Sequence, residues 1–283
     1  MRVIPISYSA QGFALLHRVC ERAGHTPVAY LHARSLRPGG PTRQGAGDVV
    51  GEIVDALPDG VDLLIPGRKG MLPHIVAGYR ADLVVCYGFP WRLPSTVLRA
   101  TALGAINVHT SMLPKYRGPL PVNWAIRNGD KEIGVSIHWM DSAFDSGGIL
   151  AQEAGIVLGD DVVPRLLWEE VDRSIERLLP VALSQAVTGF PGTPQEEGAA
   201  TYAGWMEPEF SEIDWSAPRI DVHNQVRAIR FGSSGRSGPV AGVAGHRLRV
   251  LRTSLRPAEG VEVMCADGPL WITESAPVAD SDS

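Results

Sequence analysis

The sequence predicts an α/β protein in which a Rossmann-like, mostly parallel sheet is followed by a small C-terminal β-barrel-like domain. Up to about residue 155, short apolar runs alternate with amphipathic segments, which is typical of βα units around a parallel sheet. From about residue 188, a stretch rich in Gly, Pro, Thr and Glu interrupts this pattern. Shorter strand-like runs follow it, as in small barrels.

The composition narrows the class of protein. The chain has 283 residues, 45% of them hydrophobic and 20% charged, which is ordinary for a globular protein with room for two domains. A formal net charge of -5 provides no global positive field, so binding to nucleic acid would require a local basic patch. The three cysteines are far apart, which indicates a reducing compartment. Without a signal-peptide pattern or an apolar run of ~20 residues, we expect a cytoplasmic protein with no membrane partner.

The first part of the chain is expected to contribute six strands to the sheet. They are predicted at residues 2–7, 26–31, 61–65, 83–86, 105–109 and 133–140. A first helix is expected over residues 12–23, because Phe13, Leu16 and Val19 follow helical spacing and Gly24 suits a C-cap. Residues 33–47 hold four glycines, two prolines and three arginines, which predicts a long loop.

The remainder of the chain gives the predicted domain division. Residues 160–187 have the spacing of one long helix, with Pro164 in its first turn and Pro180 as a point where it could kink. In the second module, strands are expected at residues 247–252, 261–265 and 270–273, and a helix at 219–230. We therefore predict a catalytic domain over residues 1–187, a linker over 188–204, a small OB-like domain over 205–274 and a flexible tail over 275–283.

Polar residues gather where the predicted strands end. Asn107 and His109 close the strand at 105–109, and residues two apart on a strand share a face. In open α/β sheets, ligands bind at the carboxyl ends of the strands. An amide and an imidazole on one face can both donate to a developing oxyanion, as in acyl transfer. Asp145, in a Gly- and Ser-rich loop after the next strand, could accept a proton or orient His109.

Spacing alone also allows a purely structural interpretation. An Asn and a His at a strand end are often turn formers, and Asp141 and Asp145 could be surface turn residues. The sequence contains no nucleophile elbow, P-loop or dinucleotide fingerprint that would offer a competing site.

Longer motifs resemble the signature of the folate-dependent formyltransferases. They are Asn107-x-His109-x-Ser111-x-Leu113-Pro114-x-x-Arg117-Gly118, then Gly134-Val135-Ser136-Ile137-His138, and then Asp141-x-x-x-Asp145-x-Gly147. The resemblance implies that Asn107, His109 and Asp145 are the catalytic residues. It also implies 10-formyltetrahydrofolate as the formyl donor, with no metal.

The resemblance extends to the binding residues. Residues 87–94 resemble the family's stretch before the catalytic strand, where backbone and apolar side chains line the pterin pocket. On this basis, the donor would be held by Tyr87, Gly88, Phe89, Leu93, Asp141, Ala143 and Gly147. The acceptor would contact Ser111, Arg117, Gly118 and Trp124.

The C-terminal part also resembles this family. Thr201-Tyr202-Ala203 and Ile213-Asp214-Trp215-Ser216 resemble the junction into a small barrel in its methionyl-tRNA and sugar branches. The glycinamide-ribonucleotide branch lacks such a module, and the formyltetrahydrofolate hydrolases usually carry a different one. Both are therefore disfavoured.

Charge bears on which amine accepts the formyl group. Residues 201–273 contain eight Arg and no Lys against eight Asp plus Glu, and the loop at 33–47 adds only Arg34, Arg37 and Arg43. A tRNA acceptor requires basic contacts to phosphates. We therefore expect a small amine, such as a nucleotide-linked amino sugar or an amino-acid-derived amine. A methionyl-tRNA formyltransferase is the alternative, and a catalytically idle folate-binding homologue is a second one. The neutral C-terminal module could also serve as a homodimer interface.

Overall fold

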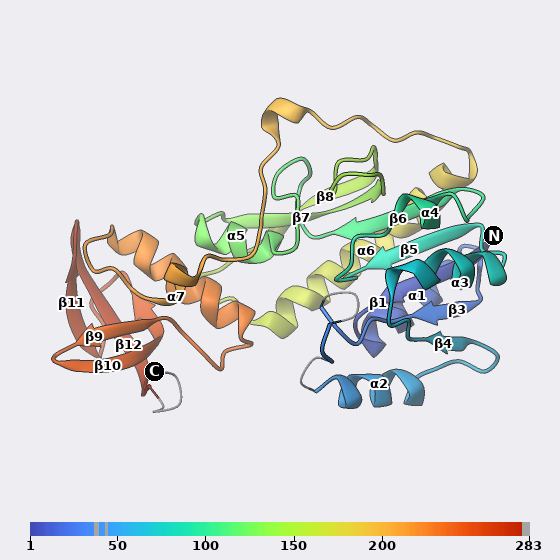
Figure 1. Cartoon of the computed structure of the whole chain (residues 1–283). Helices are drawn as coiled ribbons and strands as arrows, with labels where there is room; N and C mark the ends of the chain where they lie inside the picture. Colours follow the sequence, from blue (N-terminus) through green and yellow to red (C-terminus); the bar gives the residue numbers. More distant parts are fainter. Residues whose placement is uncertain (37–39, 43–44, 279–283) are drawn as a thin grey trace. The chain divides into compact units, whose positions relative to one another are not determined.

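The protein is described by a computed structural model covering residues 1–36, 40–42 and 45–278 (Figure 1). Two of the arginines of the predicted loop, Arg37 and Arg43, lie outside the described residues. The chain divides into two compact units. The first contains residues 1–118, 134–154 and 171–202, and the second contains residues 119–133, 155–170 and 203–283.

The first unit is organised by an eight-stranded sheet. Its order is β4-β3-β1-β5-β6-β7-β8, and β2 pairs with β1. Pairing is parallel from β4 through β6, whereas β6 and β7 are antiparallel. The strands are β1 (Arg2–Ser7), β2 (Thr26–Pro27), β3 (Ala29–Leu31), β4 (Asp62–Leu64), β5 (Leu83–Tyr87), β6 (Gly104–His109), β7 (Glu132–Trp139) and β8 (Ile149–Val157).

The described helices connect the strands. They are α1 (Ala10–Arg22), α2 (Ala46–Asp55), α3 (Leu72–Gly78), α4 (Ser95–Leu98), α5 (Pro121–Arg127), α6 (Pro164–Val187) and α7 (Arg219–Gly232). The described part of the chain also contains the short 3-10 turns η1 (Lys69–Met71), η2 (Glu197–Ala199) and η3 (Pro208–Ser211). Helix α6 continues through Pro180.

Several elements form for reasons visible in the sequence. Ser9 caps α1 by accepting a hydrogen bond from the Gly12 N–H, and the apolar residues spaced along the helix are buried. The strand expected at residues 26–31 is instead divided into β2 and β3. Pro27 lies at this break, and proline cannot donate a ladder hydrogen bond. The loop expected at 33–47 gives way to α2 at Ala46.

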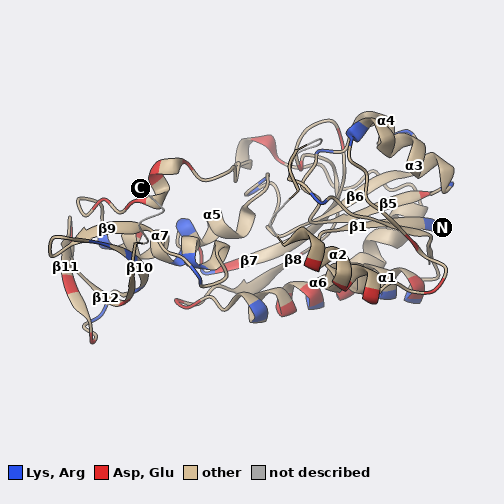
Figure 2. Cartoon of the chain, turned by 60° about the horizontal axis from the view of Figure 1, so that its bottom comes forward, with Lys and Arg blue, Asp and Glu red and all other residues tan. Residues whose placement is uncertain are grey.

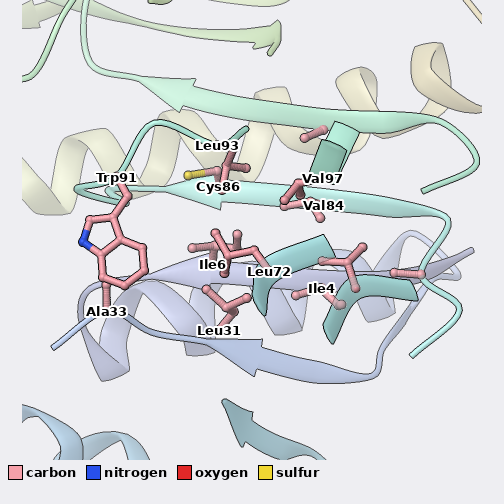
Figure 3. Packing of buried hydrophobic residues seen from close by; sticks show 13 residues of the cluster. Ile4, Ile6, Leu31, Ala33, Leu72, Val84, Cys86, Trp91, Leu93 and Val97 are labelled. Atoms are coloured by element: carbon pink, nitrogen blue, oxygen red, sulfur yellow. The ribbon is translucent and has the colours of Figure 1, made fainter. Parts of the chain in front are cut away.

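One face of the sheet packs against α3 and α4. Cys86 and Ile6 from the strands meet Leu72 from α3 and Val97 from α4 in a buried apolar cluster, which also contains Leu93 (Figure 3). The opposite face is covered by α1, α2 and α6. Phe13 of α1 stacks on Tyr30 of β3 beside α2, and Gln11 of α1 bonds to Asp172 of α6.

The second unit contains a curled, four-stranded antiparallel sheet (Figure 1). Its order is β11-β12-β10-β9, with β9 (Val240–Val243), β10 (His246–Ser254), β11 (Val261–Cys265) and β12 (Gly268–Pro277). Helix α7 packs against this sheet through Val226, which joins Val250 and Ile272 in its core. Strand β12 extends beyond Ser275, where a flexible tail was predicted. The predicted α/β class, with a mostly parallel sheet and a small β domain, is confirmed.

Within the described residues, no helix combines the length and the apolar character that crossing a membrane requires.

Candidate active site

The pairing of β6 with its neighbours places the predicted polar residues on one face of the sheet. Asn107 lies opposite Cys86 of β5 and His138 of β7, and His109 lies opposite Ser136. Residues directly opposite on paired strands point to the same face. Asn107, His109 and His138 therefore share the face that Cys86 buries against α3 and α4.

Asp145 joins this group from the loop after β7. Its Oδ2 accepts a hydrogen bond from the Gly118 N–H at 2.8 Å and lies 3.7 Å from Nδ1 of His109. Its Oδ1 accepts from Nδ2 of Asn107 at 3.3 Å and lies 3.4 Å from Nε2 of His138. The three residues predicted to be catalytic thus lie together, with Asn107 and His109 both beside the carboxylate of Asp145.

The hydrogen bonds of His109 define its protonation. Its Nε2 lies 2.7 Å from the carbonyl oxygen of Tyr116, and because a carbonyl can only accept, Nε2 carries a proton. In the neutral ring, Nδ1 is then unprotonated and faces Asp145. The sequence suggested that an imidazole N–H of His109 could donate a hydrogen bond to an oxyanion. In the structure, the Nε2 proton is instead donated to the Tyr116 carbonyl oxygen. His109 can therefore accept a proton at Nδ1.

His138 is a member of this group that the sequence analysis did not single out as a site residue. It is buried, and its Nδ1 donates to the Trp139 carbonyl oxygen at 2.8 Å. Its Nε2 lies 3.3 Å from Nδ2 of Asn107. The signal was present, since His138 closes one of the quoted motifs. Its proximity to Asn107, however, depends on the antiparallel register of β6 and β7.

The pKa shifts of Asp145 and His109 indicate which of the two side chains is charged. Burial raises the pKa of Asp145, but His109, His138 and the Gly118 N–H together outweigh burial and hold its pKa well below the usual value. Burial lowers the pKa of His109 below 6.5, although Asp145 partly opposes this. At neutral pH, an ionised Asp145 therefore lies beside a neutral His109.

The residues predicted to hold the formyl donor lie on both faces of the sheet. Leu93 is buried in the apolar cluster with Cys86 (Figure 3). The partly buried Phe89 packs against the same cluster. Tyr87 is on the opposite face, where its hydroxyl donates to Asp172 of α6 at 3.4 Å. The side chains of Leu93 and Phe89 thus lie on the face of Asn107, and that of Tyr87 does not.

Glycines and one aspartate shape the predicted donor loops. Gly88 has a φ of +79°, and a Cβ there would lie 2.1 Å from the Tyr8 ring. A Cβ on Gly147 would lie 1.9 Å from the Trp139 carbonyl oxygen. Asp141 holds its own loop by accepting from the Ala143 N–H and the Ser146 hydroxyl, both at 2.9 Å. Phe144 in this loop is exposed beneath the Arg92 guanidinium.

The residues predicted to bind the acceptor have different surroundings. The hydroxyl of buried Ser111 donates to the Lys115 carbonyl oxygen, and Gly118 provides the N–H that binds Asp145. The Arg117 guanidinium forms two hydrogen bonds to Glu197, at 3.0 and 2.7 Å. Ser111, Arg117 and Gly118 belong to the first unit together with Asp145.

Trp124 belongs to the second unit. Its Nε1 donates to the Gly204 carbonyl oxygen at 2.8 Å. The Arg127 guanidinium lies over the rings of Trp124 and Phe210, at 4.5 and 4.3 Å from their centroids, and forms an ion pair with Glu207. In this structure, Trp124 therefore contributes to an aromatic and cationic cluster within the second unit.

No group of three or more His, Cys, Asp or Glu side chains among the described residues is arranged to hold a metal ion.

Comparison with known proteins supplies the family. A sequence profile described as "Formyl transferase" matches residues 66–180, which span the site. A methionyl-tRNA formyltransferase from Nitrosospira multiformis is 34% identical over 240 residues, covering 84% of this chain and 74% of that protein. The chain belongs to the formyltransferase family.

Other members of this formyltransferase family match over different lengths. A methionyl-tRNA formyltransferase from a Synechococcus strain is 32% identical over 198 residues, covering 69% of this chain and 60% of the relative. Among solved structures, an N-formyltransferase from Helicobacter canadensis in complex with folinic acid and dTDP-3-aminofucose superposes with a TM-score of 0.67. It is 14% identical, and the match covers 98% of this chain and 100% of that one, so the likeness concerns the fold.

Proposed function

We propose that the protein transfers a formyl group from 10-formyltetrahydrofolate to a primary amine, with Asn107, His109 and Asp145 as its catalytic residues. The observation that carries this proposal is the arrangement around Asp145, whose carboxylate contacts the Asn107 amide and faces the Nδ1 of His109. The family to which the chain belongs and the folinic acid bound in the Helicobacter structure support the choice of donor.

The chemistry of these side chains suits such a donor. When bound, 10-formyltetrahydrofolate supplies an activated formyl carbon that an amine can attack directly. Direct attack requires a hydrogen-bond donor for the formyl oxygen and an acceptor for the proton that the amine loses. Asn107 provides the first, and the pair of His109 and Asp145 provides the second. We propose that Phe89, the backbone of residues 87–89 and the loop at 141–147 hold the folate.

Each residue then has a defined task. The hydrogen bonds of Asn107 Nδ2, both 3.3 Å long, are weak enough for a developing oxyanion to capture one of the amide hydrogens. His109 accepts at Nδ1 the proton that the attacking amine loses. Asp145 stabilises the resulting imidazolium from 3.7 Å. His109 then returns this proton to the nitrogen that leaves as its bond to the formyl carbon breaks.

Two acceptors are consistent with the family, and the comparisons support both. The sequence relatives described above are named methionyl-tRNA formyltransferases, whereas the Helicobacter structure contains a nucleotide-linked amino sugar. We propose a small amine as the acceptor, with initiator tRNA as the alternative. Both are consistent with a cytoplasmic enzyme, as are the three buried free thiols at Cys20, Cys86 and Cys265.

The charge distribution of the second unit supports the small amine. Arg252 and Arg230 are both paired with Asp161 and Glu274, and Arg247 is paired with Glu212. Arginines paired in this way gain less from contacting a phosphate, because the existing partner must first be displaced. In Figure 2, Lys and Arg positions (blue) and Asp and Glu positions (red) are interspersed along the ribbon.

A paired activity assay tests both the reaction and the acceptor. Wild-type protein and the Asn107→Ala variant are incubated with 10-formyltetrahydrofolate and either charged initiator tRNA or a panel of nucleotide-linked amino sugars and amino-acid-derived amines. We expect turnover with at least one small amine, lost in the variant and only weakly dependent on salt. Efficient tRNA formylation would replace the proposed acceptor. Folate binding without turnover in either arm would favour an idle homologue.

A further inference from the structure

The segment over residues 193–201, here called the strap, is bonded to both sides of the site within the first unit. At one end, Thr193 exchanges two backbone hydrogen bonds with Ile149, each 2.8 Å long. At the other end, the Thr201 carbonyl oxygen accepts from the Arg117 N–H at 2.9 Å, and its hydroxyl accepts from the Tyr116 N–H at 2.8 Å. The strap therefore lies against the segment at 114–117 and the start of β8.

Gln195 lies in the middle of the strap and uses its whole amide. Its Nε2 donates to the carbonyl oxygens of Asp145 and Gly147, both at 2.8 Å. Its Oε1 accepts from Nε of Arg117 at 3.0 Å. The orientation of this amide is fixed by its partners, because a flipped amide would place its oxygen against two carbonyl oxygens and its NH2 group against a guanidinium N–H.

These bonds reach the two backbone segments that set the geometry of the site. Asp145 has a φ of +51°, a left-handed conformation that costs free energy for a residue with a Cβ. Arg117 lies between Tyr116, whose carbonyl holds His109, and Gly118, whose N–H holds the carboxylate of Asp145. A single side chain thus connects the loop of the carboxylate to the segment that fixes the imidazole.

We propose that Gln195 is a positioning residue for formyl transfer, which holds the backbone of Asp145 so that its carboxylate faces His109 and Asn107. The role rests on the proposed function, since it concerns the same site. Arg117 takes part in this positioning, because Glu197 and Gln195 both form hydrogen bonds to its guanidinium. The guanidinium therefore acts through Gln195 and does not need to reach the acceptor.

The test compares Gln195→Glu and Gln195→Ala with the control Glu196→Gln. Glu at position 195 keeps the size and the acceptor for Arg117, but its carboxylate replaces both donated bonds with repulsion between oxygens. Gln195→Ala removes all three bonds without adding charge and serves as the second variant if the first folds poorly. Glu196 is an exposed neighbour on the same strap. Its substitution by Gln exchanges a carboxylate for an amide, the reverse of Gln195→Glu, at a position away from the Asp145 loop.

Two readouts are needed, and the first is independent of activity. Hydrogen exchange of the Gly118 amide, followed by ¹⁵N NMR, reports on its bond to Asp145. We expect exchange at least about 10-fold faster in both Gln195 variants and unchanged in Glu196→Gln. For the reaction, we expect kcat to fall by about 10- to 100-fold at similar KM for the formyl donor, since small displacements of catalytic groups have effects of this size.

The outcomes separate the positioning role from the proposed function. Unchanged Gly118 exchange in both Gln195 variants would overturn the proposal, and so would a kcat within twofold of wild type in folded variants. A merely structural role would lower thermal stability or the active fraction without selectively exposing Gly118. If the wild type transfers no formyl group, the proposed function fails, but the exchange measurement still decides whether Gln195 positions Asp145.

Discussion

Two aspartates, one in each unit, have opposite surroundings. Asp145 of the first unit has a side chain that is 14% exposed and is surrounded by two imidazoles, an amide and a backbone N–H. Asp161 of the second unit is 49% exposed and pairs with the guanidinium groups of Arg252 and Arg230. The first carboxylate faces groups that can gain or lose a proton, whereas the second faces permanent cations.

This difference indicates where chemistry can occur. An exposed ion pair such as that of Asp161 is worth about 0–1 kcal/mol and is screened by salt. A buried carboxylate beside a neutral imidazole can instead change its interaction energy when that imidazole takes a proton. We therefore propose that proton transfer takes place in the first unit and that the ion pairs of the second unit are structural.

Replacing each aspartate with its amide should give the largest contrast. Asp145→Asn keeps the shape but cannot stabilise an imidazolium at His109, so kcat should fall by about 10²–10³-fold, as for other electrostatic groups in acyl transfer. Asp161→Asn, the matched control, should leave kcat within twofold of wild type. Steady-state kinetics on folded variants check both, and an Asp145→Asn variant within tenfold of wild type would remove this carboxylate from the mechanism.

Adding one methyl group should distinguish the loop of Asp145 from the sheet of the second unit. In Gly147→Ala, the new Cβ would lie 1.9 Å from the Trp139 carbonyl oxygen, so the backbone must shift. We expect a loss of about 1–3 kcal/mol in the free energy of unfolding.

Gly242→Ala in β9 is the control, because a Cβ there meets no atom within 4 Å. Its free energy of unfolding should change by less than about 0.5 kcal/mol, as for most substitutions in open space. Urea unfolding measures both variants. Equal losses would show that the Asp145 loop is not tightly constrained.

The two units should also differ in how their histidines titrate. Burial lowers the pKa of His109, and the charge of Asp145 partly offsets this. Asp145→Asn should therefore lower the pKa of His109 further. The pKa of His223 in the second unit, lowered to about 4 by burial and then by Arg227, should stay unchanged. NMR titration of the ring protons checks both, and a higher pKa for His109 in the variant would contradict the assigned pairing.

The same shifts fix the sign of the pH dependence of stability. Both histidines bind protons more weakly in the folded protein than in the unfolded chain, where the pKa is 6.5. Their contribution to stability is thus fully present above pH 6.5 and decreases as the pH falls below it. For His223, this decrease levels off near pH 4, where the folded form also becomes protonated.

The sequence predicted the parts of the molecule that depend on local patterns. The shared face of Asn107 and His109 follows from their spacing on one strand. The loop after the next strand suggested Asp145 as their partner, and the resemblance implied that all three are catalytic. Helix α2 was not predicted, since Gly47 and Gly51 lower its helix propensity. Strand β8 was missed because its polar centre, with Gln152 and Glu153, interrupts the apolar run.

Long-range contacts could not be predicted from local patterns. His138 reaches Asn107 only through the antiparallel register of two strands. Gln195 lies 50 residues beyond Asp145, in a stretch whose Gly and Pro content indicated a linker. Its three hydrogen bonds depend on the chain returning to the site, which no periodicity encodes.

The most direct test of the central claim is a titration of the ¹⁵N-labelled protein with folinic acid, a stable formyl-folate, followed by NMR. The side-chain amide signal of Asn107, assigned by its loss in Asn107→Ala, and the ring signals of His109 are monitored. If these residues form the formyl-transfer site, both sets of signals should shift together and saturate, while His223 in the second unit stays constant. Saturable binding that leaves Asn107 and His109 unchanged, or no binding at millimolar folinic acid, would contradict the account.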